Sequence, residues 1–389
     1  MAHYLIEQVL SMAKQRFYNI KSLLETKATY LLLLGERSNG KSYQAKYTAL
    51  WEAWHECDYG EYLTTGKMVD KKRYQFAYLR RWGDDIKTTP INDYFADMYD
   101  AIKEITNGGA TGIECFKSII YFTKYDITTD KEERIKEIGR PFSLNSAQHY
   151  KSRMFPYIGN VLMEEVIPDD GVYLPTEVTN LFSIVSTIAR RDEIRVMMIG
   201  NTMNRVCPYF TEWCLTPVLK QKQGTIDIYR QTTNRLDDNG NPIIITIAVE
   251  MCETMGQQNR MFFGQKAKSI VTGVWDTETY PQLEDDFKNY DEYYELLYIH
   301  REFAFMIKLL RSPKDEILLF VYPYTGDINK VTRRISEEYS LSPFITPKLG
   351  KVTKYDELVG QLIDNRKICF SDNLTGTDFY NTIKERGKL

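Results

Sequence analysis

Apolar runs and amphipathic stretches alternate along the first half of this chain, which predicts strands followed by helices. Runs at Tyr30–Leu34, Tyr157–Glu165 (YIGNVLMEE) and Ile194–Asn201 are typical of buried strands. Apolar residues at steps of three and four predict helices over Lys41–His55 and Thr176–Arg190. Because strands alternate with helices, we expect an α/β fold with a doubly wound, mainly parallel sheet.

The pattern becomes less regular after Val206, where Asp237–Asn241 (DDNGN) predicts a hairpin turn. We therefore expect a first domain over residues 1–204, a linker over 205–235 and a smaller α+β domain over 236–389. Further predicted elements are a leading helix at Tyr4–Leu24, a strand at Tyr74–Arg80, a helix at Ile91–Ile105, an antiparallel excursion between Cys115 and Phe142, and a strand at Ile317–Tyr324.

Composition narrows the class of protein without identifying it. A chain of 389 residues with 43% hydrophobic and 26% charged residues has enough apolar material for two cores. The net charge of −3 argues against a broadly basic coat for nucleic acid, although a local patch stays open. Six scattered cysteines and four histidines show no zinc spacing, and we expect reduced thiols in a cytosol. No signal peptide or membrane span is predicted.

The strongest chemical signal is a glycine-rich loop directly after the first apolar strand. The spacing G-x-x-x-x-G-K-S lets backbone N–H groups turn inward around phosphate oxygens, with the following helix dipole aimed at the same place. The lysine of this motif reaches the β- and γ-phosphates, and the serine coordinates Mg²⁺. We therefore expect ATP and Mg²⁺ as cofactors. The predicted nucleotide-binding residues are Gly35, Glu36, Arg37, Ser38, Asn39, Gly40, Lys41 and Ser42.

An acidic pair, Glu164 and Glu165, follows the apolar run NVLM and resembles a Walker B motif. Ligand-binding groups gather at the carboxyl edge of open α/β sheets, so this pair is expected near the glycine-rich loop. Glu164 is the predicted Mg²⁺ ligand together with Ser42, although aspartate is more usual at this position. Glu165 is the predicted catalytic residue that polarises the attacking water. The alternative is a strand that ends in two solvated carboxylates.

Two further catalytic candidates follow the acidic pair. Asn201 ends the next strand and is expected to sense the γ-phosphate or to orient water; the alternative is a simple turn former. Arg190 and Arg191 end the preceding helix. One of them is expected to reach the nucleotide of a neighbouring subunit, but cations at a helix C-terminus also complement its dipole.

The segment from Glu164 to Phe210 resembles the DNA-packaging ATPase of small podophages of the phi-twenty-nine type. It contains the acid pair, a YLP-x-EV loop, a helix, paired arginines, a strand, an asparagine and CPYF. Similar segments are RFYNIKSLL, YLRR, FSLNSAQHY and KSRMFPYIGN. The resemblance covers residues 16–215 well and the C-terminal half weakly.

This resemblance implies an ASCE-class P-loop translocase that drives double-stranded DNA into a procapsid. It implies a homo-oligomeric ring, for which we expect a pentamer, and the portal (connector) and a structural packaging RNA as partners. The location would be the host cytoplasm, with docking at the portal vertex. The C-terminal domain would be RNase H-like and non-catalytic, and Phe17–Asn19 would either line an adenine pocket or pack in the core.

The DNA-binding residues are less readable from the sequence. Lys117, Lys124, Lys151 and Arg153 lie in or near predicted loops, where contacts would go to phosphates; the alternative for each is a solvated charge. Two other functions remain open. A working nuclease would need converging carboxylates, for which Asp276 is the best candidate among Asp276, Glu278, Asp285 and Asp286. A nucleotide-gated assembly factor would bind ATP without translocation.

Overall fold

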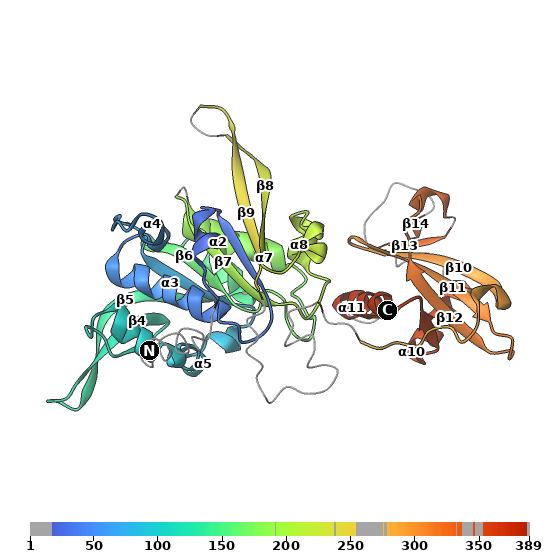
Figure 1. Ribbon diagram of the computed structural model, residues 1–389, viewed down its shortest axis with the longest axis horizontal. Helices are drawn as coiled ribbons and strands as arrows, with labels where there is room; N and C mark the ends of the chain where they lie inside the picture. The colour runs from blue at the N-terminus through green and yellow to red at the C-terminus, as the bar shows by residue number, and fades with distance from the viewer. Residues whose placement is uncertain are drawn as a thin grey trace, which may run out of the picture. The chain divides into compact units, whose positions relative to one another are not determined.

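The computed structural model describes residues 18–190, 192–236, 239–253, 275, 278–331, 333–336, 345–346 and 353–386. The chain forms two compact units (Figure 1). Unit 1 comprises Met1–Pro168, Tyr173–Met203 and Pro217–Val274; unit 2 comprises Asp169–Val172, Asn204–Thr216 and Trp275–Leu389. Each unit has its own sheet and hydrophobic core. Within the described ranges, no helix combines the length and the apolar character needed to cross a bilayer.

Unit 1 is built on a nine-stranded sheet with the order β3-β4-β5-β2-β6-β7-β1-β9-β8. The strands from β5 to β9 in this order are parallel, and an antiparallel pairing closes each end. The strands are β1 (Tyr30–Gly35), β2 (Gln75–Arg80), β3 (Gly112–Phe116), β4 (Ile119–Asp126), β5 (Lys131–Ser143), β6 (Ile158–Met163), β7 (Arg195–Asn201), β8 (Thr225–Leu236) and β9 (Pro242–Met251).

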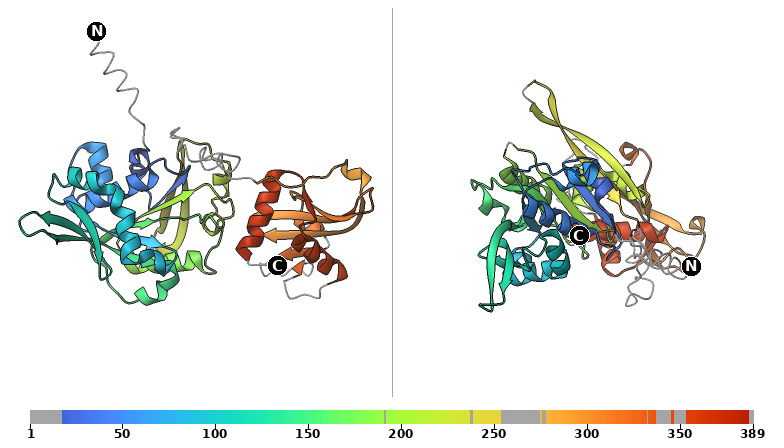
Figure 2. Two further views of the ribbon diagram at one scale, coloured as in Figure 1. Left: turned by 90° about the horizontal axis from the view of Figure 1, so that it is seen from below. Right: turned by 60° about the vertical axis from the view of Figure 1, so that its left-hand side comes forward.

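Helices cover both faces of this sheet, as Figure 2 shows, because its central strands are apolar on both sides. Leu31 and Leu33 of β1 pack in one cluster with Ala45 of α3, whereas α7 contacts β6 and contributes nothing to that cluster. The predicted doubly wound α/β sheet is confirmed. The helices are α2 (Lys21–Glu25), α3 (Lys41–His55), α4 (Tyr59–Thr65), α5 (Thr88–Phe95), α6 (Tyr99–Ile105) and α7 (Glu177–Ala189), with 3₁₀ turns η1 (Gly83–Ile86), η2 (Ala96–Met98), η3 (Leu144–Tyr150) and η4 (Thr216–Lys220).

Local predictions in unit 1 hold with two exceptions. The antiparallel excursion is present as β3, β4 and the first part of β5. The helix expected at Ile91–Ile105 is instead two helices, α5 and α6, joined by the 3₁₀ turn η2. Of the leading helix expected at Tyr4–Leu24, residues 1–17 lie outside the described residues, and the described part forms only the short α2.

The predicted boundary between the domains is wrong. Strands β8 and β9 pair as an antiparallel hairpin, and β9 pairs in parallel with β1 through the register Tyr30↔Ile247 to Leu34↔Met251. Unit 1 therefore extends well past residue 204. The run Ile247–Val249 is buried and apolar because it is an inner strand of the first sheet, and local periodicity cannot say which sheet a strand joins.

Unit 2 is an α+β unit, as predicted, with the strand order β14-β13-β10-β11-β12-β15. β10, β11 and β12 form an antiparallel meander, while β13 is parallel to β10 and β15 is parallel to β12. Helices α10 and α11 share its core with the sheet. The elements are α8 (Pro208–Glu212), η5 (Phe287–Asn289), β10 (Asp291–His300), β11 (Phe303–Arg311), β12 (Ile317–Pro323), η6 (Ile328–Lys330), β13 (Arg334–Ser336), β14 (Ile345–Thr346), α10 (Lys354–Asp364), β15 (Ile368–Phe370) and α11 (Asn373–Arg386).

Residues 205–216, expected to belong to a linker, are packed within unit 2, together with Asn204. Arg205 forms a 2.8 Å ion pair with Asp378 of α11, and the Thr211 hydroxyl donates a 2.6 Å hydrogen bond to Glu302. Both partners are more than 90 residues away in sequence, so this anchoring depends on tertiary contacts.

Candidate nucleotide-binding site

The glycine-rich loop joins the buried strand β1 to helix α3, as the sequence predicts. Gly35 has φ of 149°, and an added Cβ there would lie 3.2 Å from Cys252. Gly40 is the N-cap of α3 with φ of 99°, a left-handed conformation that favours glycine. The two glycines of the motif are therefore required by backbone conformation and, at Gly35, also by close packing.

Lys41 points into the loop and is 3% exposed. Its ammonium group donates to the carbonyl of Glu36 and, over 3.2 Å, to the side-chain oxygen of Asn39. Burial lowers the pKa of Lys41 below its usual value. Loop oxygens thus hold a buried cation at the place where phosphate oxygens would be its partners.

Glu164, directly after β6, meets the first turn of α3. Its Oε2 accepts a 3.2 Å hydrogen bond from the Ser42 hydroxyl, and its Oε1 accepts a 2.6 Å bond from the Tyr94 hydroxyl of α5. Burial raises the pKa of Glu164, and the two hydrogen bonds offset only part of that effect. No lysine or arginine in the described ranges forms an ion pair with it. A buried carboxylate beside a serine hydroxyl is a donor set suited to Mg²⁺.

Glu165 lies next to Glu164 in sequence but in a different environment. Its backbone has φ of 54°, and its side chain is 55% exposed. Arg80, at the end of β2, forms a 2.8 Å ion pair with Glu165 and a longer one, 3.5 Å, with Asp85. One acid is therefore fixed at the loop, and the other is accessible and held by a single arginine.

Asn201 lies at the centre of this edge. It ends β7, the strand between β1 and β6, and the sheet register pairs it with Gly35. The structure thus brings the three predicted components to one edge of the sheet: the glycine-rich loop, the acidic pair and the asparagine. The chemical roles of these residues remain predictions.

Arg190 lies at the opposite edge of the sheet. It ends α7, five residues before β7 begins, whereas the glycine-rich loop follows the carboxyl end of β1. Its guanidinium donates a 2.9 Å hydrogen bond to the carbonyl of Arg153. Capping of α7 is provided by Arg73 instead, which donates to the carbonyls of Ile188 and Ala189. Arg191 lies outside the described residues.

The four basic candidates for DNA contacts are all exposed and come from two regions. Lys117 lies in the turn between β3 and β4, and Lys124 is on β4 opposite Glu133. Lys151 and Arg153 follow η3, where the Arg153 guanidinium lies 5.8 Å from the Phe155 ring. Exposure is compatible with phosphate contacts and equally with solvated charges, so these assignments stay predictions.

Sequence reasoning missed two residues of the site and left a third open. Tyr94 and Arg80 hold the two acids; Tyr94 belongs to no motif, and Arg80 lies in the segment YLRR, which predicted no role for it. For Phe17–Asn19, Phe17 lies outside the described residues. Tyr18 is 2% exposed, and its hydroxyl donates to Glu250 over 2.7 Å, which agrees with core packing.

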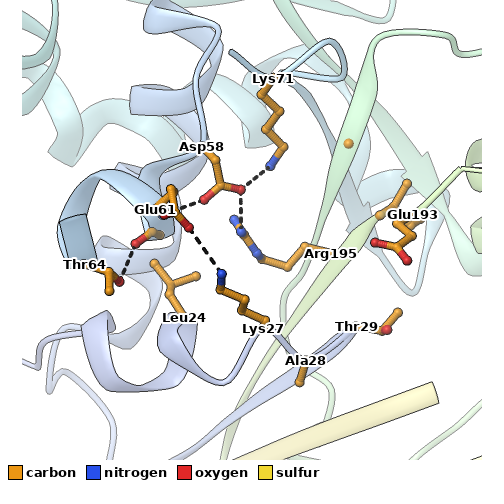
Figure 3. A pocket seen from close by; sticks show the side chains of 13 residues that line it. Leu24, Lys27, Ala28, Thr29, Asp58, Glu61, Thr64, Lys71, Glu193 and Arg195 are labelled. Carbon is orange, nitrogen blue, oxygen red and sulfur yellow. Dashed lines mark hydrogen bonds and ion pairs between the residues drawn. The ribbon is translucent and has the colours of Figure 1, made fainter. Parts of the chain in front are cut away.

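A separate pocket of about 320 Å³ lies at the amino edge of the sheet, away from the glycine-rich loop (Figure 3). Its lining includes Asp58, Lys71 and Arg195, with Asp58 paired to both cations. The fully buried Glu52 also pairs with Arg195 and Lys71. Burial alone would raise the pKa of Glu52, but the two cations outweigh it and lower the value to about 2. These charges compensate one another in a structural network.

The nuclease candidates of the C-terminal half do not form a metal site in the described part of the chain. Glu278 accepts a hydrogen bond from the Tyr280 hydroxyl, and Asp286 caps η5. Asp276 lies outside the described residues. Within those residues, no group of three or more His, Cys, Asp and Glu side chains could hold a metal ion.

The fold and this edge define a P-loop protein of the ASCE class, in which one strand separates the glycine-rich-loop strand from the strand of the acidic pair. The chain belongs to the family of the Podovirus DNA encapsidation protein (Gp16), whose model matches residues 12–238.

Similar proteins include the DNA packaging proteins of Bacillus phages phi29 and PZA. Each is 24% identical over 219 residues, which are 56% of this chain and 55% of the relative. The chain thus spans about half the length of the curated relatives it matches. A solved structure of the Phi-28 gp11 DNA packaging motor shares the fold, with a TM-score of 0.51 and 16% identity over 96% of this chain and 98% of that one.

Proposed function

We propose that this protein is an ATP-hydrolysing motor that translocates double-stranded DNA into a procapsid as a homo-oligomeric ring. The observation that carries the proposal is the 3.2 Å contact between Ser42 of the glycine-rich loop and Glu164 of the acidic strand, with Asn201 between their strands. ATP hydrolysis requires a phosphate-binding loop, a carboxylate that can bind the metal ion and a polar residue that can position water. All three lie at this edge of the sheet. Membership of a DNA encapsidation family supplies the substrate class.

The roles of the residues follow from their environments. Lys41, buried in the loop, would exchange its loop oxygens for β- and γ-phosphate oxygens. Ser42 and Glu164 would hold Mg²⁺, which when bound would neutralise the charge that develops on the phosphates. Glu165 is accessible enough to contact and orient a water molecule, and Arg80 limits where its carboxylate lies. Asn201, beside Gly35, would orient the same water or the γ-phosphate.

The position of Arg190 supports action on a neighbouring subunit. Because it lies at the amino edge of the sheet, it is remote from the glycine-rich loop of its own chain. If Arg190 stabilises the transition state, it would therefore have to act on the nucleotide of the next subunit, as in a ring. Arg191 is an equal candidate by sequence. A pentamer is the ring size that we propose.

Unit 2 is proposed to dock at the portal, with a structural packaging RNA as a further partner. Its order β12-β11-β10-β13-β14, an antiparallel meander followed by parallel strands, agrees with the RNase H-like fold that the family resemblance implies. We propose a non-catalytic role for it. DNA would be held through phosphate contacts by Lys117, Lys124, Lys151 and Arg153 as the protein works in the host cytoplasm at the portal vertex.

The test is the ATP hydrolysis rate as a function of added double-stranded DNA and of salt, with Glu165→Gln measured alongside. A translocase predicts stimulation that fades as salt rises and is absent in Glu165→Gln. A measurable rate without DNA stimulation would favour a nucleotide-gated assembly factor. Mn²⁺-dependent cleavage of plasmid DNA would instead favour a motor with a working nuclease.

The trans arginine has its own test. Subunits carrying Glu165→Gln would be mixed with subunits carrying Arg190→Ala or Arg191→Ala. A ring with a trans arginine predicts partial recovery of hydrolysis in one mixture, because an intact arginine then faces an intact site. No recovery in either mixture would contradict this role.

A further inference from the structure

Tyr94 is the one neutral side chain of the described residues that joins Ser42 in contacting the Glu164 carboxylate. We propose that Tyr94 is a positioning residue: it holds Oε1 of Glu164 so that Oε2 faces Ser42 and the Mg²⁺ of a bound nucleotide. The inference rests on the proposed nucleotide site. It deepens that proposal, because it makes the Mg²⁺ affinity of Glu164 depend on a residue outside every motif.

The geometry divides the carboxylate between two helices. The Tyr94 hydroxyl of α5 lies 2.6 Å from Oε1, and the Ser42 hydroxyl of α3 lies 3.2 Å from Oε2. The hydrogen bond to Oε1 restricts the positions that the carboxylate can occupy. Its other oxygen, Oε2, then faces the first turn of α3. Bonds to an ionised acceptor are short and strong, in agreement with the closer contact at Tyr94.

Tyr94 can fix another side chain because it is itself held. Its ring stacks on Tyr78 of β2 at 4.6 Å between centroids and meets Phe95 at 4.9 Å. Lys46 of α3 donates a 2.9 Å bond to the Tyr94 carbonyl and lies 4.6 Å from the ring. The hydroxyl is therefore placed by packing on both sides of the residue.

A glutamate needs this support more than an aspartate would. Glu164 has one more rotatable bond than the aspartate usual in this motif, so its carboxylate can occupy more positions unless something restrains it. Its length also allows it to reach Tyr94 and Ser42 at once. Second-sphere bonds that orient a metal ligand typically contribute about 10- to 100-fold to metal affinity.

The purely structural alternative is that Tyr94 contributes only its ring to the packing of the core. Tyr47 offers a matched control, because its hydroxyl also donates to a carboxylate, that of Glu104, over 3.2 Å, and its ring also packs against the same hydrophobic cluster. Replacing either tyrosine by phenylalanine removes one hydroxyl and keeps the ring. Only the Tyr94 hydroxyl touches a predicted metal ligand.

The experiment measures binding of a non-hydrolysable ATP analogue by calorimetry, in Mg²⁺ and in EDTA, for the wild type, Tyr94→Phe and Tyr47→Phe. We expect Tyr94→Phe to reduce the affinity gain from Mg²⁺ by about tenfold, with the affinity in EDTA unchanged. Tyr47→Phe should keep the full gain. Thermal melting of both variants should agree within a few degrees.

A double-mutant cycle sharpens the result. In a Glu164→Asp background the shorter side chain cannot reach both hydroxyls, so Tyr94→Phe should cost far less of the Mg²⁺ gain than it does in the wild type. An undiminished Mg²⁺ gain in Tyr94→Phe, an equal loss in Tyr47→Phe, or loss of the fold in Tyr94→Phe would each overturn the inference. A wild type that binds no nucleotide would refute the proposed function itself, a result distinct from these.

Discussion

Glu52 and Glu164 are both buried carboxylates of the same unit, yet their environments are opposite. Glu52, at the amino edge of the sheet, contacts Arg195 and Lys71, and these cations lower its pKa to about 2. Glu164, at the carboxyl edge, has two neutral hydroxyls as partners, and burial raises its pKa. The first network is complete in the protein alone. In the described residues the second acid forms no ion pair; Arg80 and Lys46 act on it only from a distance, and its pKa stays raised, as suits a carboxylate that would bind a metal ion.

The largest expected effect is on catalysis at the carboxyl edge of the sheet, where Glu164 lies. Lys41→Ala should reduce ATP turnover by about a hundredfold or more, because the buried ammonium group that would bind the β- and γ-phosphates is lost. Glu165→Gln should reduce kcat by about 10²- to 10⁴-fold, because the carboxylate that would polarise the attacking water is lost. Steady-state ATP hydrolysis measures both. Glu165→Gln should retain ATP binding, and normal turnover in either variant would move the site elsewhere.

The next largest effect is on the free energy of unfolding, which should respond differently to replacement of Glu52 and of Glu164. Glu52→Gln should lower the free energy of unfolding by about 3–5 kcal/mol, because it removes the fully buried acid that Arg195 and Lys71 share and leaves only Asp58 among the described residues to pair with them. Glu164→Gln, in contrast, removes a buried charge that forms no ion pair in the described residues, so stability should stay within about 1 kcal/mol or rise. Urea denaturation without nucleotide measures both. Equal losses would show that the two acids have the same role.

The pH dependence of stability should differ in sign between the two acids. The folded pKa of Glu52 lies below its unfolded value of 4.5, so its contribution is present above that pH and is lost as pH falls toward 2. That loss is on the order of 3 kcal/mol for a fully buried group.

The folded pKa of Glu164 is raised instead. Its contribution is therefore greatest below the unfolded value and is lost as pH rises through the folded pKa. Subtracting the pH profile of Glu52→Gln or Glu164→Gln from that of the wild type isolates each term. Two difference profiles of the same sign would contradict the assignment.

The smallest expected effect concerns the exposed acid. Arg80→Ala should change stability by less than about 1 kcal/mol, as is usual for a partly exposed ion pair. It should lower kcat by about tenfold with little change in KM, because Glu165 loses the partner that limits its position. Arg134→Ala, which breaks an exposed pair with Glu114, is the matched control. A KM effect alone would assign Arg80 to nucleotide binding.

Part of the site could be predicted because its signals are contiguous. The loop from Gly35 to Ser42 carries its backbone requirements in its own spacing, and the acids at 164 and 165 follow an apolar run that predicts a buried strand. Their meeting at one edge follows from parallel strands. Arg80 and Tyr94 carry no such signal, since each acts through a partner 70 or more residues away.

The sequence by itself determined the α/β class, the glycine-rich loop and the acids at the end of a strand, because local spacing encodes backbone conformation and burial. Only the tertiary structure decided that β8 and β9 complete the first sheet and that residues 204–216 pack in unit 2. It also decided that Glu52 is ion-paired while the described partners of Glu164 are two hydroxyls. The physical reason is that strand partners and the charges around a buried acid are set by residues distant in the chain.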